Sequence, residues 1–407
     1  MMTCMFRLPL LIAVLLAPAV LAEDWTHQPV RVSAREFPIM AWSGSPSGIE
    51  SLRLMKEAGL NLSGFCRAEE LDAVRDAGLM CIVSRTPLEA MVARPETTSA
   101  QIQEAVSALA ARIGSHPAAF GVYLRDEPSA AQMPMIGRLA QALLKAMPGK
   151  VPYVNLFPNY ATRQQLGAAS YEEHLRAYFK FVRLPYLSWD NYSLTDGEMQ
   201  QSFYDNLDIV RKLTLEAKVP FWNCILATTM FRYMEPSEAT FSLQVYSTLA
   251  YGGRGIQYFT YFTPDNGNYR LAAVDPYGNR TPTWDIMRRI NNQIHALAPT
   301  LLKLHSTGVY HWPVSTAAGT GLLKDIKTSG KLVVGEFAGP GGRRYVMLVN
   351  KSLKESVSFR LETWKEGASL HRVSPASGQE GGFGGEANWL APGGGILLRI
   401  QDLQPAQ

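Results

Sequence analysis

The sequence is poor in charge and in cysteine, and after its first 22 residues it lacks any long apolar run. Charged residues make up 18% of the 407 residues, and a net charge of +4 without a basic cluster is too weak to indicate a nucleic-acid partner. With 47% apolar residues the chain does not have the composition of a disordered protein. No later segment reaches the roughly 18 consecutive apolar residues of a membrane span, so we expect no integral membrane span. A globular protein rich in Trp and Tyr remains.

The four cysteines do not form the pattern of a disulfide framework. Cys4 lies in a segment that we expect to be removed, which leaves Cys66, Cys81 and Cys224. These three are widely spaced, odd in number and each set within an apolar run. Such cysteines are usually buried free thiols, and that is the prediction here.

The first 22 residues resemble a secretory signal peptide. A short basic start is followed by an apolar segment over residues 8–22, with the small residues Val20 and Ala22 before the expected cleavage site. An uncleaved membrane anchor is the alternative, which the shortness of the segment and its prolines, Pro9 and Pro18, disfavour. We therefore expect the mature protein to be exported, either periplasmic or secreted.

Residues 23–304 alternate short apolar runs with amphipathic stretches of helical periodicity. Eight such strand–helix units in about 270 residues have the size of a (β/α)8 TIM barrel. An open doubly wound sheet is the alternative, but the segment after the first run does not match its glycine-rich phosphate turn. The eight predicted strands are 38–42, 60–65, 79–84, 120–128, 152–157, 185–192, 220–227 and 255–262.

Residues 305–407 have a different pattern, in which short β-rich runs alternate with glycine-rich turns. The runs 331–337, 343–350, 356–362 and 395–400 are typical of antiparallel strands. We expect a small all-β sandwich domain here, with an accessory role, because it carries no catalytic motif.

Functional side chains of a TIM barrel gather at the carboxyl ends of its strands. These ends are rich in aromatic, amide and carboxyl groups, the mixture that binds sugars, because aromatic rings stack on sugar C–H faces while polar groups bond the hydroxyls. The candidates for the site are Trp42, Arg125, Asp126, Glu127, Asn155, Asn159, Tyr160, Trp189, Asp190, Asn191, Tyr192, Trp222, Asn223, Arg232, Tyr233, Glu235, Tyr258, Tyr261 and Asp265.

Two carboxyl groups in this set fit the hydrolysis of a glycosidic bond, which needs an acid for the leaving oxygen and a carboxylate as nucleophile or base. Glu127 is the candidate acid, since burial at a strand end raises a carboxyl pKa. Asp190 is the best candidate for the second carboxylate, although it could equally bind a sugar hydroxyl or cap a helix. Glu235 is a third candidate, but it or Ser237 more simply begins the next helix.

Other chemistries find little support in the sequence. There is no HExxH, no strand ending in His-x-His and no GxSxG, and the cysteines have no histidine partner nearby. We expect neither a metal nor a cofactor.

The runs FGVYLRDEP, YVNLFPNY, LSWDNY and YGGRGIQYFTYF on successive predicted strands look like glycosidase signatures. The chain resembles clan A (β/α)8 glycoside hydrolases, in particular β-galactosidase-like, family 42-like barrels followed by a β-sandwich. The resemblance implies the acid/base role for Glu127, which follows the fourth strand. In that clan an Asn usually precedes this Glu, but Asp126 stands here. The clan also places its nucleophile at the end of the seventh strand, where FWNCILATTM has no acid.

These observations predict an exported glycoside hydrolase that cleaves O-glycosidic bonds in an oligo- or polysaccharide. The alternative is a non-catalytic glycan-binding protein on a glycosidase-derived barrel, which the missing acid of the seventh strand favours. Turnover of an oligosaccharide separates the two.

Overall fold

A computed structural model describes residues 37–402, apart from positions 45, 47, 314–320, 366 and 385–387. The expected signal peptide, 1–22, and the start of the expected barrel domain, 23–36, lie outside the described residues. Among the described residues, no helix combines the length and apolarity that crossing a membrane requires.

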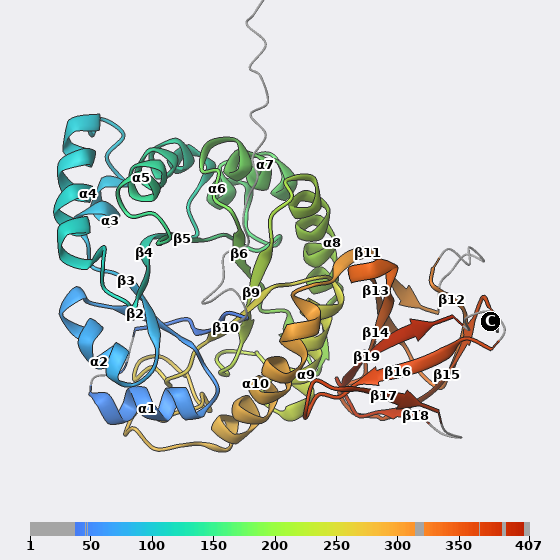
Figure 1. Cartoon of the computed structure of the whole chain (residues 1–407). Helices are drawn as coiled ribbons and strands as arrows, with labels where there is room; N and C mark the ends of the chain where they lie inside the picture. Colours follow the sequence, from blue (N-terminus) through green and yellow to red (C-terminus); the bar gives the residue numbers. More distant parts are fainter. Residues whose placement is uncertain are drawn as a thin grey trace, which may run out of the picture.

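Eight parallel strands form the barrel, and each overlaps a predicted strand, with ends that differ by up to three residues (Figure 1). Their order around the sheet is β5-β4-β3-β2-β1-β10-β9-β6, and β5 meets β6 through a bridge between Leu156 and Trp189. The Leu156 N–H donates to Ser188 O at 2.9 Å across this seam. The strands are β1 (Ile39–Ala41), β2 (Leu62–Cys66), β3 (Met80–Val83), β4 (Ala119–Asp126), β5 (Val151–Asn155), β6 (Leu187–Asp190), β9 (Phe221–Leu226) and β10 (Gly255–Phe259).

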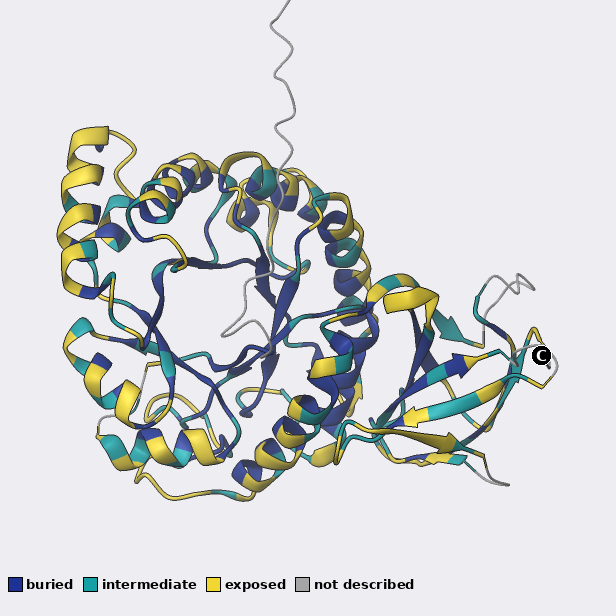
Figure 2. Ribbon diagram, in the orientation of Figure 1, coloured by how far each residue is buried: buried dark blue, intermediate teal, exposed yellow. Residues whose placement is uncertain are grey.

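Helices surround the strands, with their buried faces turned inward and their exposed faces outward (Figure 2). As their spacing predicts, α1 and α2 are each followed by a glycine with positive φ, Gly59 and Gly78. A two-stranded hairpin of β7 (Leu194–Thr195) and β8 (Glu198–Met199) follows β6. The helices are α1 (Ile49–Glu57), α2 (Leu71–Asp76), α3 (Pro87–Met91), α4 (Ser99–Ile113), α5 (Met133–Ala146), α6 (Arg163–Leu166), α7 (Tyr171–Phe181), α8 (Gln201–Glu216), α9 (Glu238–Ala250) and α10 (Pro282–Leu301).

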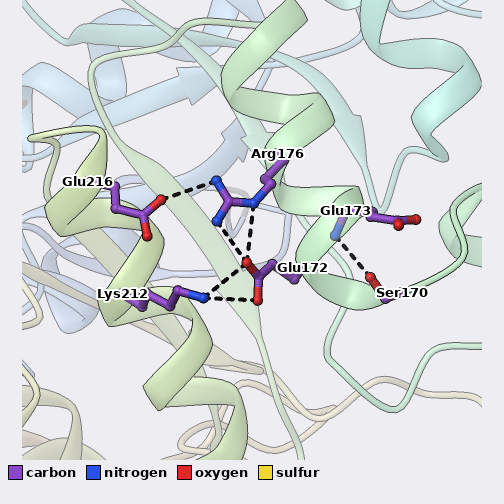
Figure 3. Close-up of polar contacts among 6 residues, drawn as sticks. All are labelled: Ser170, Glu172, Glu173, Arg176, Lys212 and Glu216. Atoms are coloured by element: carbon purple, nitrogen blue, oxygen red, sulfur yellow. Dashed lines mark hydrogen bonds and ion pairs between the residues drawn. The ribbon is translucent and has the colours of Figure 1, made fainter.

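The two helices that flank β6 in the chain, α7 and α8, are joined by a surface ion-pair network (Figure 3). Arg176 of α7 bonds Glu172 at 2.7 Å and Glu216 of α8 at 3.1 Å, while Lys212 of α8 bonds Glu172 at 3.1 Å. Exposed pairs of this kind contribute about 1 kcal/mol or less each. Apolar packing therefore holds these helices in place, and the network adds to it.

The C-terminal part consists of two antiparallel sheets that pack face to face. One has six strands in the order β11-β13-β14-β19-β16-β17, and the other has the order β12-β15-β18. Their facing side chains, including Val346, Leu348 and Phe359, form a separate apolar core. The strands are β11 (His305–Trp312), β12 (Leu323–Thr328), β13 (Leu332–Ala338), β14 (Arg344–Asn350), β15 (Val357–Thr363), β16 (Ser369–Val373), β17 (Glu380–Phe383), β18 (Asn388–Leu390) and β19 (Gly395–Gln401).

The six-stranded sheet packs directly on helix α9 of the barrel (Figure 1). A Cβ added at Gly335 of β13 would lie 2.1 Å from the carbonyl oxygen of Ala250, the last residue of α9. A Cβ at Gly393, whose φ is +67°, would lie 2.1 Å from the carbonyl oxygen of Ala239 at the other end of the helix. Glycine at both positions lets sheet and helix approach backbone to backbone. The barrel core accordingly continues into sandwich residues such as Met347.

The prediction of three free thiols is wrong for two of them, because Cys66 and Cys81 form a disulfide. The residues lie near the ends of the adjacent strands β2 and β3, with their Cα atoms 6.3 Å apart, within the range that a disulfide spans. Local sequence could not pair them, because parallel strand pairing, not chain neighbourhood, brings them together. Cys224 is a buried free thiol, as predicted.

We predict that removing this crosslink by the paired substitution Cys66→Ser and Cys81→Ser lowers the free energy of unfolding. The bond closes a 15-residue loop, for which about 3 kcal/mol is expected. Denaturant titration of wild type and double variant measures the loss. Thiol counting on unreduced, denatured protein starting at residue 23 should give one thiol, that of Cys224, and a count of three would contradict the crosslink.

Candidate active site

Three carboxyl groups come from the carboxyl ends of two barrel strands. Asp126 ends β4 and Glu127 follows it, whereas Asp190 ends β6. Glu127 has a left-handed backbone conformation, with φ +46°, and its N–H donates to Asn155 O of β5 at 2.8 Å. Such a conformation is disfavoured for a residue with a side chain, and residues of this kind concentrate at functional sites.

Asp126 lies at the end of a buried polar chain that crosses from β4 to β6. Asn155 donates its side-chain amide to Asp126 Oδ1 at 3.3 Å and accepts from Ser188 Oγ at 2.8 Å. Ser188 in turn accepts from the amide of Gln257 on β10 at 2.6 Å. Burial raises the pKa of Asp126 to about 6, against the opposing effects of Asn155 and the nearby Arg125.

Glu127 is partly buried, and two effects on its pKa act in the same direction. Loss of hydration is the larger, and the negative charge of Asp126 adds to it, so that the pKa of Glu127 rises to about 7. A carboxyl group with this pKa is largely protonated just below neutral pH, which is the state that a proton donor needs.

Asp190 is the most deeply buried of the three carboxyl groups, with 7% of its surface exposed. Its Oδ1 is buried and has no hydrogen-bond partner among the described residues. Burial, followed by the charges of Glu127 and Asp126, raises the pKa of Asp190 well above its usual value, whereas a hydrogen bond with Tyr192 lowers it. A buried carboxyl oxygen without a hydrogen-bond partner lowers the stability of the fold. Such an oxygen is explained when a ligand or a water binds to it.

Aromatic side chains surround this carboxyl cluster. The ring of Tyr192 stacks on Phe259 at 5.2 Å between centroids and meets Tyr233 edge to face at 6.3 Å. Trp42, after β1, packs against Phe259 at 5.6 Å. Tyr160, which is 49% exposed, accepts a hydrogen bond at its hydroxyl from the Tyr192 N–H at 3.1 Å. Tyr233 and Tyr160 both feel the charge of Asp190, which contributes to their raised pKa values.

Two residues of this surround were not among the sequence candidates, Phe259 and Cys224. Phe259 is the last residue of β10, and Cys224 of β9 pairs in register with Asp190 and lies 3.6 Å from the Tyr192 hydroxyl. Strand alternation could have identified Phe259, because Tyr258 beside it points outward to Asn291 of α10.

The expectation that Trp189, Trp222 and Tyr261 offer their rings to a ligand is wrong. All three are 0% exposed and belong to the core. Trp222 packs against Tyr186 with ring centroids 4.8 Å apart, deep in the barrel. Tyr261 accepts a hydrogen bond from the Trp284 indole of α10 at 3.2 Å. Their apolar bulk serves packing, because nothing of their surface remains to meet a ligand.

Two of the predicted amides also have structural partners. Asn223 is fully buried, and its amide donates to Thr248 of α9 at 2.8 Å, so it faces the helix layer and not the site. Asn191, 1% exposed, donates to Asn206 of α8 at 3.1 Å and so ties the end of β6 to that helix. These contacts explain both residues without a ligand.

Two further candidates, Arg125 and Glu235, lie on exposed surface. Arg125 is exposed at the end of β4, near Asp126. Glu235 is exposed in the loop after β9, where it forms an ion pair with Arg270 at 3.5 Å. Ser237, not Glu235, caps α9 by accepting from the Thr240 N–H at 3.1 Å. Within the described part of the chain, no group of three or more His, Cys, Asp or Glu is arranged to hold a metal ion.

No protein-family model and no curated protein matches the sequence. Similarity is found among solved structures. A family 5 glycoside hydrolase from Bacteroides vulgatus is 11% identical, with a TM-score of 0.57 over 93% of this chain and 94% of that chain. Another glycoside hydrolase is 10% identical, with a TM-score of 0.54 over 93% of this chain and 98% of that one.

A β-galactosidase from Marinomonas ef1 is also similar, at 11% identity and a TM-score of 0.48, but the match spans only 64% of this chain and 60% of the enzyme. At sequence identities near 10%, these matches are evidence of a similar fold and of nothing more. The two matches with TM-scores above 0.5 show that the chain, a (β/α)8 barrel followed by antiparallel β-sheets, shares its fold with glycoside hydrolases.

Proposed function

We propose that this protein is an exported glycoside hydrolase that cleaves O-glycosidic bonds in an oligo- or polysaccharide. The observation that carries the proposal is the cluster of Asp126, Glu127 and Asp190 at the carboxyl ends of barrel strands. Burial raises the pKa of all three, and repulsion between carboxyl charges adds to it at Glu127 and Asp190. Carboxyl groups with shifted pKa values at this end of a barrel are typical of acid–base catalysis.

Glu127 acts as the general acid. With a pKa of about 7 it holds a proton near neutral pH and gives it to the leaving oxygen as the glycosidic C–O bond breaks. The resulting Glu127 carboxylate then recovers a proton from water. Asn155 holds the neighbouring Asp126 in position and takes no part in the proton transfer.

Asp190 acts as the second carboxylate, either attacking the anomeric carbon or removing a proton from the attacking water. It must be ionised to do so. Burial and the other two carboxyl groups oppose that, while the hydrogen bond from Tyr192 favours it. Glu127 and Asp190 both carry negative charge when ionised and repel each other, so that over a range of pH the two share one proton. Hydrolysis requires the form in which Glu127 holds that proton and Asp190 is ionised.

Trp42, Tyr160, Tyr192 and Tyr233 supply ring faces and hydroxyls around these carboxyl groups, as a sugar ring requires. The disulfide between Cys66 and Cys81 supports export, since such bonds persist in oxidising compartments and are rare in the cytosol.

A non-catalytic glycan-binding protein is the second candidate. The observation that favours it is the absence of an acid on β9 (Phe221–Leu226), where Cys224 stands in register with Asp190. Under this candidate the protein retains oligosaccharide binding but shows no turnover with any substrate.

We predict that Glu127→Gln lowers the turnover of an oligosaccharide substrate by about 10²- to 10⁴-fold, because the amide cannot supply the proton. The measurement is kcat on the substrate that a panel of oligo- and polysaccharides identifies for the wild type. Glu57→Gln is the matched control, since Glu57 at the end of α1 is exposed, paired with Arg280 and not a candidate for the site. Equal losses in both variants, or none in either, would contradict the role of Glu127.

The pH dependence of kcat/KM tests the same role independently. Activity should fall as pH rises through about 7, because Glu127 loses the proton that it must donate. The residual activity of Glu127→Gln should lack this alkaline limb. A wild-type profile that keeps rising above pH 7 would oppose the assignment.

Asp190→Asn should remove activity and also raise stability at alkaline pH. The folded-state pKa of Asp190 lies above its unfolded value, so its stabilising contribution is present at low pH and is lost as pH rises. Asparagine does not titrate, so the Tm of the variant relative to wild type should increase between pH 4 and pH 8, by on the order of a few degrees. Asp265→Asn, in an exposed loop, is the control. A Tm difference between Asp190→Asn and wild type that stays constant from pH 4 to pH 8 would contradict a raised pKa of Asp190.

A further inference from the structure

A groove of about 820 Å³ lies where the sandwich meets the barrel. One wall comes from α9 and α10 and the other from strands β16, β17 and β18 with the turn before β19. We call it the interdomain groove, and its principal lining residues are Ser237, Tyr246, Gln293, Arg372, Phe383 and Trp389.

The interdomain groove has a fixed shape, because its floor is a close contact between the two parts of the chain. A Cβ added at Gly395 would lie 2.4 Å from the ring of Tyr246, and a Cβ added at Gly393 would lie 2.1 Å from the carbonyl oxygen of Ala239. Neither wall can shift without opening these contacts. A site formed in this way is largely preformed, as ligand sites between domains usually are.

The lining of the interdomain groove combines exposed aromatic surface with uncommitted polar groups. Trp389 is 60% exposed, and the ring of Phe383 stacks on Phe359 at 6.1 Å. The side-chain oxygen of Gln293 accepts a hydrogen bond from the Tyr246 hydroxyl at 2.7 Å. The amide N–H groups of Gln293 have no partner among the described residues. Arg372 is exposed beside them. This combination suits a sugar, whose C–H faces pack on rings while its hydroxyls bond amide and guanidinium groups.

The charges of the interdomain groove favour a neutral glycan. Glu238, at the start of α9, is already paired with Arg289 at 2.9 Å. Arg372 is then the principal unpaired charge among the lining residues, and a single cation offers little attraction to a polysaccharide with a negative charge on each unit.

The interdomain groove begins a short distance along the chain from the aromatic residues around the carboxyl cluster. Ser237 lines it and is four residues from Tyr233, whose ring contacts Tyr192. Four extended residues span at most about 14 Å, so the groove begins within that distance of Tyr233. One extended glycan is therefore long enough to reach from the carboxyl cluster to the interdomain groove.

We propose that the interdomain groove binds distal units of the same neutral glycan whose scissile bond lies at Glu127 and Asp190. This inference rests on the proposed function and narrows it: the substrate is an extended oligo- or polysaccharide, not a disaccharide or a simple aryl glycoside. The sandwich then contributes directly to substrate recognition through Trp389 and Arg372.

The test is Trp389→Ala in the full-length protein, with Trp364→Ala as the matched control. Trp364 is also an exposed tryptophan of the sandwich, 53% exposed, but its indole donates to Gly321 O at 2.8 Å outside the interdomain groove. Affinity electrophoresis in gels containing soluble galactan, mannan or β-1,3-glucan measures binding without requiring turnover. We expect at least one polymer to retard wild type and Trp364→Ala, with binding roughly five- to tenfold weaker in Trp389→Ala.

Kinetics gives a second readout once a hydrolysed polymer is known. The ratio of kcat/KM on the polymer to kcat/KM on an aryl glycoside should fall in Trp389→Ala and not in Trp364→Ala. Equal retardation of wild type and Trp389→Ala, or no retardation by any polymer, overturns the inference. Retardation that depends on Trp389 without any turnover would uphold the interdomain groove and reject the hydrolase, so the two failures are distinguishable.

Discussion

Closure of the barrel between β5 and β6 is the constraint on which the site depends. Without it, the end of β4 and the end of β6 would lie toward opposite edges of an open sheet, because β6 is one terminal strand of its order and β4 is next to the other, β5. The backbone bond from Leu156 to Ser188 and the side-chain bond from Ser188 to Asn155 cross this seam together. Asp126 is thereby linked to β6, and Asp190 comes close enough to feel the charges of Asp126 and Glu127.

The same closure explains why all three carboxyl groups resist ionisation. A barrel interior is filled by side chains and excludes water, so the loss of hydration at the strand ends is severe. Aromatic rings complete the exclusion: Tyr192, Phe259 and Trp42 form a contiguous apolar layer beside the carboxyl groups. The protein thus keeps an electrostatically unfavourable cluster at the cost of stability, a pattern that is common where function requires it.

The sequence predicts the strands well and the orientation of side chains less well. All eight barrel strands were identified because each is a short apolar run before a helix, and the carboxyl ends of β4 and β6 followed from the fold. Whether a strand residue points to the site depends on strand parity and on where pairing slips, as at the irregularity between Tyr123 and Arg125. Residue type assigns Trp189 and Asn223 to the site, but Trp189 is part of the core and Asn223 bonds Thr248 of α9, a helix remote in sequence. The Cys66–Cys81 pairing was missed for the same reason, since it depends on strand adjacency.

Helix α9 has a consequence for how the chain folds. Every residue of α9 from 240 to 250 is buried, since the barrel covers one side of the helix and the six-stranded sheet covers the other. A helix covered on all sides belongs to no single domain. A fragment that stops before the sandwich would leave an apolar helix face open to water, so the two parts are expected to melt in a single cooperative transition and to be inherited as one unit.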